Sequence, residues 1–249
     1  MNVFPIGRGL LISLAMLGLS ACVSSGLIPE SQIQKSADSE WQSILEAKPP
    51  STNLTQTRLV SITSDRILRA AGEDPSEWQT VLFDDPETVN AFALPNNKIG
   101  IFFGLVGHVE NEDQLAAIIG HEVAHVRLRH AEERLSRGFA PGVLIGVAKL
   151  PGAVTGVGAL ESVGEVAGGA VAAGTIYPFN RNDELEADLE GLKYLADAGY
   201  DPNEAAEFWR NLNNSDAGKK RKVPEFLSTH PSDERRVAAL EKAARELTQ

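Results

Sequence analysis

The stretch His121-Glu122-Val123-Ala124-His125 decides how the rest of the chain is interpreted. On an α-helix, residues four apart lie about 40° apart on one face, so both imidazoles can bind the same metal ion. Glu122 is offset by about 100° from His121, which directs its carboxylate toward a water on that metal and away from the metal itself. This arrangement is typical of zinc hydrolases.

The flanking residues predict that the motif lies within an amphipathic helix. Asn111 can cap this helix, and Glu112 and Asp113 place negative charge in its first turn, where the helix dipole favours it. An apolar stripe follows, formed by Leu115, Ala116, Ile118, Ile119, Val123 and Val126. The motif is therefore expected in mid-helix among apolar neighbours. The simplest alternative is a surface helix with two incidental histidines.

A catalytic zinc usually takes three protein ligands, so one more is needed. One known spacing would place a histidine ten residues after His121, but Ala131 occupies that position. The nearby His130 is predicted on the opposite side of the helix, facing solvent or in the cap region. A second source is an acidic helix start, where Glu184 and Asp188 share a face. Glu184 could complete the zinc shell, and Asp188 could accept the free ring N–H of a ligating histidine.

Spacing alone leaves the assignment of Glu184 open, because acidic residues at a helix start are common for electrostatic reasons. Together with Arg181-Asn182-Asp183-Glu184-Leu185-Glu186-Ala187-Asp188, however, the motif resembles the zinc peptidase family of the HtpX-like, Oma-type and CAAX prenyl proteases. The resemblance extends from about residue 55 to the C-terminus, and three further stretches share it. These are Asn90-Ala91-Phe92-Ala93-Leu94-Pro95, Gly104-Leu105 and Ser228-Thr229-His230-Pro231.

The resemblance implies an α+β fold, a mostly helical zincin-like metallopeptidase domain with a small β-sheet beside the zinc-binding helix. It also implies one zinc ion per chain, with Glu184 as the third ligand beside His121 and His125. The chain departs from the family pattern at Asn96-Asn97, where glycines are usual, and at Asn180, where serine is usual. The first departure puts the geometry of that turn in question.

The predicted function is zinc-dependent endopeptidase activity on misfolded or unassembled envelope proteins. Zinc would activate a water, and Glu122 would take its proton and later protonate the leaving amine. His230 is open to two interpretations. It could be part of a helix-entry turn with Pro231 at the helix start, or it could reach the metal site. There it would stabilise the oxyanion or seal the fourth zinc position, and a sealed site would instead suit a client-binding or assembly factor.

The first 21 residues are typical of a lipoprotein signal peptide. Arg8 precedes an apolar run of about eleven residues, which is too short to span a bilayer. The following Leu19-Ser20-Ala21-Cys22 resembles the bacterial lipoprotein box, in which the cysteine is lipidated. Cys22 is the only cysteine of the chain, and Val23 follows it where aspartate would oppose export. The sorting pattern of such lipoproteins favours the outer membrane, with the catalytic domain facing the periplasm. An ordinary cleaved leader is the alternative.

After the leader, residues 22–52 are expected to form a lipidated tether with one short helix, and residues 53–249 the metallopeptidase domain. The domain is predicted to begin with a helix and three short strands, and to end with a helix. These elements are expected at residues 53–72, 79–83, 90–94, 98–103 and 232–247. An exposed edge strand could bind an extended segment of an unfolded or misfolded protein substrate through backbone hydrogen bonds.

Two further features bear on partners. The formal net charge is −11, and the one basic run, Lys219-Lys220-Arg221-Lys222, is short, so nucleic-acid binding is not expected. Residues 137–175 are rich in glycine, alanine and valine, but their glycines, prolines and internal charges argue against a membrane span. They could form a lid or an apolar surface for a membrane or client protein, or a close-packed buried hairpin.

Overall fold

The computed structural model describes residues 29–133, 179–214 and 225–248. The predicted signal peptide, Cys22, the basic run and the segment 137–175 lie outside these described residues. Within them, no helix combines the length and the apolar composition that crossing a membrane would require.

The described elements confirm a mostly helical α+β domain with one small sheet. They are α1 (Glu30–Ala47), α2 (Leu54–Ala70), a 3-10 turn (Pro75–Glu77), β1 (Gln79–Phe83), β2 (Ala91–Leu94), β3 (Lys98–Phe102), α3 (Phe103–Val106), α4 (Glu112–Arg127), α8 (Arg181–Asp197), α9 (Asn203–Asn214), α11 (Glu225–Thr229) and α12 (Glu234–Leu247). The three strands begin and end within one residue of their predicted positions. The final helix begins two residues later than predicted, because the Asp233 side chain caps it by accepting from the amides of Arg235 and Arg236.

The sheet has the strand order β1-β3-β2, with β1 parallel and β2 antiparallel to β3. The strand β3 is therefore central, and β2 is an edge strand. The turn between β2 and β3 contains Asn97 in the left-handed region, at φ 61°. Asparagine adopts this region more readily than most residues, so the absence of the usual glycine leaves the turn intact.

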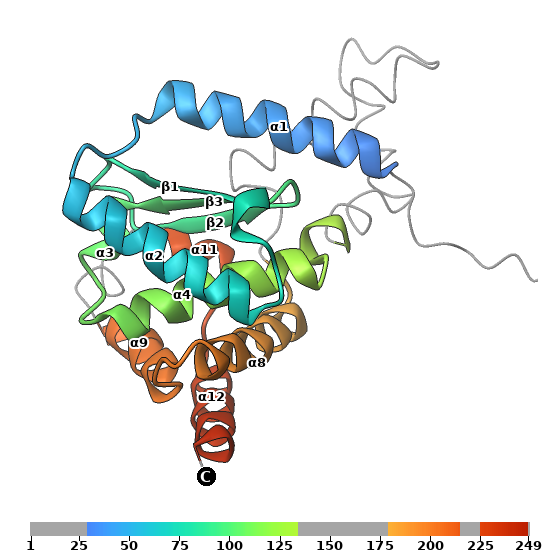
Figure 1. The fold of residues 1–249 in the computed structure, drawn as a ribbon. Coiled ribbons are helices and arrows are strands. Elements are labelled where there is room, and N and C mark those ends of the chain that lie inside the picture. Colours follow the sequence, from blue (N-terminus) through green and yellow to red (C-terminus); the bar gives the residue numbers. More distant parts are fainter. Residues whose placement is uncertain (1–28, 134–178, 215–224, 249) are drawn as a thin grey trace, which may run out of the picture.

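Both faces of the sheet carry buried side chains, because successive strand residues point in opposite directions. Helices cover both faces. Figure 1 shows α1 on one side of the sheet and α2 and α4 on the other. On the α1 side, Phe83 and Phe102 pack with Trp41. On the other side, Leu82 and Ile101 join the main core, which contains the apolar stripe of α4. The helix α4, which carries the motif, thus lies directly against the sheet.

The helix α1 corrects the expectation that the residues before the domain form a tether with one short helix. It is 18 residues long, and its Trp41 is 1% exposed. The Nε1 of Trp41 donates a hydrogen bond to Gln79 Oε1 at 3.0 Å. The buried residues Ile33, Ala37 and Trp41 recur at every fourth position, which gives α1 an apolar face to set against the sheet. Lys35, Asp38 and Glu40 lie between these positions, so the apolar face of α1 is difficult to recognise in the sequence.

The helices α4 and α8 approach each other through two glycines. A Cβ atom at Gly191 would lie 2.8 Å from the carbonyl carbon of Gly120 and 2.9 Å from the amide nitrogen of His121. These neighbours are backbone atoms of a helix and cannot move aside without displacing it. The close crossing sets the acidic face of α8 against the two histidines of α4.

We expect Gly191→Ala to push α8 away from α4 and to withdraw Glu184 from the histidines. Overpacking of this kind costs about 1–3 kcal/mol of unfolding free energy, and zinc affinity should fall at least about tenfold. Urea denaturation and competition with a chromophoric chelator measure the two effects. Gly107→Ala is the matched control, because its Cβ would make only an ordinary 3.4 Å contact with Gly104 O. Equal behaviour of the two variants would contradict the close-crossing argument.

Candidate metal centre

The helix α4 presents three buried polar side chains in its C-terminal half, and His125 belongs to its last turn, so the motif lies nearer the helix end than the mid-helix position that the sequence predicted. Its start is fixed by Asn111, whose side chain accepts from the amide of Gln114 at 2.9 Å, as the sequence predicted. His121, Glu122 and His125 are each 2–3% exposed and lie among the apolar residues of the helix. The motif therefore belongs to the interior, and the alternative of incidental surface histidines is wrong.

The helix α8 brings a carboxylate to these histidines. Its first turn is capped by Asn180, which accepts from the amides of Asn182 and Asp183. Glu184 is fully buried, and its two carboxylate oxygens lie 3.5 Å from His121 Nε2 and 3.4 Å from His125 Nε2. The two histidine Nε2 atoms are 3.0 Å apart.

These separations fit a zinc ion. In a tetrahedral site with bonds of 2.0–2.1 Å, the ligand atoms lie roughly 3.3 Å from one another. The ligand atoms of His121, His125, Glu184 and His230 all lie within 4.8 Å of one another, and all four residues are buried. Nitrogen and carboxylate donors of this kind are the set that zinc prefers. The site can therefore bind one zinc ion, as predicted.

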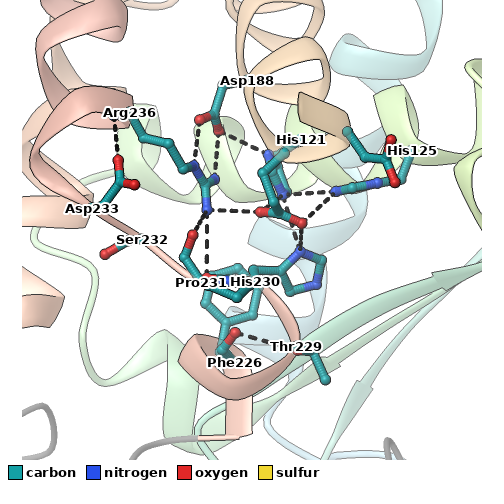
Figure 2. A network of polar contacts seen from close by, with 12 residues as sticks. His121, His125, Asp188, Phe226, Thr229, His230, Pro231, Ser232, Asp233 and Arg236 are labelled. Atoms are coloured by element: carbon teal, nitrogen blue, oxygen red, sulfur yellow. Dashed lines mark hydrogen bonds and ion pairs between the residues drawn. The ribbon is translucent and has the colours of Figure 1, made fainter. Parts of the chain in front are cut away.

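His230 is distant from the motif in the sequence but reaches the site from its position just after α11 (Figure 2). Its Nδ1 lies 3.1 Å from His121 Nε2 and 3.1 Å from Glu184 Oε1, and its Nε2 lies 3.4 Å from Glu122 Oε1. It is 2% exposed. Of the two interpretations from sequence, the structure supports the one in which His230 lies at the metal site. Pro231 is not the first residue of α12, because that helix begins only at Glu234.

A buried ion-pair network orients the first histidine of the motif. Asp188 Oδ1 lies 2.9 Å from His121 Nδ1, as expected from the shared face of α8. The same carboxylate accepts two hydrogen bonds from Arg236, at 2.7 and 2.8 Å (Figure 2). Arg236 also lies 2.7 Å from Glu184 Oε2, and its guanidinium stacks over Trp209 at 4.2 Å. One arginine therefore holds the carboxylates of Glu184 and Asp188 in place.

Arg236 is a site residue that the sequence interpretation missed. Two adjacent arginines in the first turn of a helix look like ordinary surface residues, yet Arg236 is only 3% exposed. A usable signal existed, because Glu184 and Asp188 on one buried face require a cation. The arginines that follow the His230-Pro231 step were the available candidates.

The buried charges shift one another's protonation. Burial disfavours a charged imidazole, but hydrogen bonds to Asp188 and Glu184 outweigh it and raise the pKa of His121 to about 9. Burial and the charge on His121 hold the pKa of His125 well below its usual range. Burial alone would raise the pKa of Glu184, but the charge on His230 and hydrogen bonds from the histidines hold it well below normal. Zinc binding must then release a proton, since only a neutral imidazole binds metal.

His130 lies in the cap region of α4, two residues after the C-cap Leu128, which is one of its two predicted positions. The other prediction, that it faces solvent, is wrong, because it is 2% exposed and its Nδ1 lies 3.0 Å from His125 Nδ1. Its Nε2 lies 3.6 Å from the carboxylate of Glu186. The helical period fails here because α4 ends at Arg127, and Arg129 adopts φ 60°, which turns the chain back. His130 is not one of the candidate ligands. It contacts the ligand His125 at Nδ1, the ring nitrogen that does not face the other ligands.

The glutamate of the motif, Glu122, faces a groove. Its Oε1 is buried and has no hydrogen-bond partner among the described residues. The groove has a volume of about 410 Å³, and its walls are α1 and the edge strand β2. Glu122 and His230 both line it. A carboxylate beside a metal-ligand cluster, with no hydrogen bond among the described residues to hold it and only the 3.4 Å contact with His230, has the position that a general base requires.

Comparison with known proteins agrees with this geometry. Residues 53–244 match the family described as Peptidase family M48. The chain belongs to this family. The prediction that the chain is a member of a zinc metallopeptidase family is thereby confirmed. The matched residues include all four candidate ligands. The helix α1 precedes the matched region.

The chain is also similar to proteins that carry peptidase names. Mitochondrial metalloendopeptidase OMA1 of Schizosaccharomyces pombe is 32% identical over 185 residues, which cover 74% of this chain and 52% of that protein. The putative beta-barrel assembly-enhancing protease of Vibrio cholerae is 31% identical over 191 residues, which cover 73% and 37%. The beta-barrel assembly-enhancing protease of Escherichia coli is 29% identical over 185 residues, which cover 73% of this chain and 37% of that protein. The chain therefore spans about half or less of the length of these relatives.

Proposed function

We propose that this chain is a zinc-dependent endopeptidase with His121, His125 and Glu184 as zinc ligands and Glu122 as general base. The observation that carries the proposal is the convergence of three buried ligand atoms beside a carboxylate that faces a groove and whose Oε1 has no hydrogen-bond partner among the described residues. A purely structural metal site would gain nothing from that carboxylate.

The chain's own residues divide the chemistry of peptide hydrolysis among them. A zinc ion held by the ligands supplies Lewis acidity, which lowers the pKa of water and polarises a peptide carbonyl. Glu122 accepts the proton of the attacking water and then gives it to the leaving amine. Asp188 fixes the orientation of His121 through the 2.9 Å contact with Nδ1. His230, whose Nε2 lies 3.4 Å from Glu122, is placed to stabilise negative charge that develops on the substrate.

The substrate would bind as an extended segment along β2. This strand pairs only with β3 among the described strands, and the residues from Asn90 to Pro95 line the groove. Pairing through backbone hydrogen bonds tolerates many side chains, which suits unfolded or misfolded proteins as substrates. The relatives named as beta-barrel assembly-enhancing proteases support misfolded or unassembled envelope proteins as the clients.

The location follows from the N-terminal sequence. Cys22 in the lipoprotein box would carry the lipid that attaches the chain to the bacterial outer membrane, with the catalytic domain facing the periplasm. Incorporation of radiolabelled palmitate in the native chain, and its loss in Cys22→Ser, test the anchor. Equal labelling of both chains would remove this part of the proposal.

A second function is favoured by the position of His230. Its Nδ1 lies within the ligand cluster, and as a fourth ligand it would close the site. The chain would then act as a client-binding or assembly factor with a sealed, conditionally active zinc site.

The variant His230→Ala separates these two functions. If His230 stabilises charge in the transition state, cleavage of an unfolded protein at saturating zinc should fall about 100-fold, and this is the result we expect. Turnover of a fluorescent casein with excess zinc measures it. Faster cleavage by the variant would instead favour the sealed site, and an unchanged rate would remove His230 from both roles.

A further inference from the structure

The helix α1 contributes one wall of the groove that faces the metal site. Its lining residues are Glu40, Ser43, Ile44, Ala47 and the following Lys48, which recur three and four apart and so share a face. The opposite side of the groove contains the edge strand β2, and the groove extends to Glu122 and His230. Because α1 precedes the residues that match family M48, this wall is a feature that the family match does not describe.

Glu40 is the unusual residue of this wall. It is 7% exposed, and no hydrogen bond or ion pair to it occurs within the part of the chain that the structure describes. Burial raises the pKa of its carboxyl. A carboxylate in such surroundings is costly unless a cation or a hydrogen-bond donor compensates it. Among the described residues, Lys48 is the one lysine or arginine that lines the groove, and it is already paired with Asp85.

The surroundings of the groove also define what could approach Glu40. Aromatic and aliphatic side chains line it, and they include Ile44, Phe92 and Phe102. Lysine and arginine combine a long apolar stem with a cationic head. Such a side chain could lay its stem on this apolar lining while its head pairs with the carboxylate. An acidic side chain would instead meet the two negative charges of Glu40 and Glu122.

We propose that Glu40 forms a specificity subsite that takes a lysine or arginine side chain of the substrate. This inference rests on the proposed peptidase function. When a substrate occupies the edge strand β2, α1 covers it from the other side, and Glu40 selects a basic residue at one fixed distance from the scissile bond. Pairing with β2 uses only the backbone of the substrate, so the subsite would add selectivity for one of its side chains.

The test is a set of unfolded peptides in which lysine, norleucine or glutamate occupies each position around one cleavage site. Norleucine keeps the length of the stem and removes the charge. We expect the native chain to cleave the lysine peptide at one position about tenfold faster in kcat/KM than its norleucine partner. Glu40→Gln should bring this ratio close to one, and Glu40→Arg should turn the preference toward glutamate. Glu46→Gln, an exposed residue of the same helix outside the groove, should leave the ratio unchanged.

A lysine preference that survives in Glu40→Gln, or the absence of any preference in the native chain, would overturn the subsite. If the native chain cleaves no peptide, the proposed peptidase function fails, and a binding measurement then decides the subsite alone. Fluorescence anisotropy of the same peptide pairs on the zinc-loaded chain, with and without Glu40→Gln, is that measurement. Tighter binding of a lysine peptide that Glu40→Gln abolishes supports the subsite, and equal binding of each pair refutes it.

Discussion

Replacement of Glu122 by glutamine is expected to abolish peptide hydrolysis and to leave one zinc ion bound per chain. Glutamine has the size of glutamate and still fits its buried position, but it cannot accept the proton of water. Glu122 Oε1 lies 3.4 Å from His230, and Glu122 is not part of the ligand cluster, so the zinc ligands remain complete. The loss of a general base costs about 10²–10⁴ in rate. Cleavage of fluorescent casein and zinc content by elemental analysis measure the two properties.

The control for this variant is Glu110→Gln. Glu110 is an exposed residue that lies just before α4, and it neither lines the groove nor contacts the ligands. It should retain both zinc and activity. Activity of Glu122→Gln within a factor of ten of the native chain would disprove the role of general base. Loss of zinc together with activity would show instead that Glu122 supports the metal site.

The part of the site that sequence predicts well is the part that lies within one helix. His121 and His125 share a face because of the helical period alone, and the apolar stripe of α4 places that face in the interior. Glu184 was different, because spacing left its role open and only the resemblance assigned it. The structure then placed its carboxylate 3.4–3.5 Å from both histidines. No local pattern determines a contact between helices about 60 residues apart.

The residues that sequence did not place depend on tertiary packing. His130 follows a left-handed residue, which breaks the period that its predicted position assumed. Arg236 becomes buried only because α12 packs against α8 and α9. Trp41 likewise holds α1 on the sheet, where Glu40 then lines the groove. The strands were easier, since alternation and turn residues mark them locally.

The second large effect is expected from Arg236→Met. Methionine keeps the apolar contact with Trp209 but removes the cation that lies 2.7 Å from both Asp188 and Glu184. Breaking one side of a buried ion pair costs about 3–5 kcal/mol of unfolding free energy, because the remaining charge is left without compensation. In the metal-free chain, both carboxylates lose this cation and keep only the protonated His121 as a positive neighbour on α4. With zinc bound, the positive metal compensates Glu184, so the loss should be smaller. Urea denaturation with chelator and with zinc measures the difference.

Two further variants distinguish lost charge from lost packing. Arg235→Met alters the neighbouring arginine, whose side chain is 76% exposed and pairs only with Asp233 among the partners that the structure describes. It should change the unfolding free energy by less than about 0.5 kcal/mol. The double variant Arg236→Met with Asp188→Asn removes charge from both sides and should be more stable than Arg236→Met alone. Additive losses in the double variant would mean that packing, and not the pairing of Arg236 with Asp188, accounts for the effect. The orientation of His121 would then have to depend on some other contact.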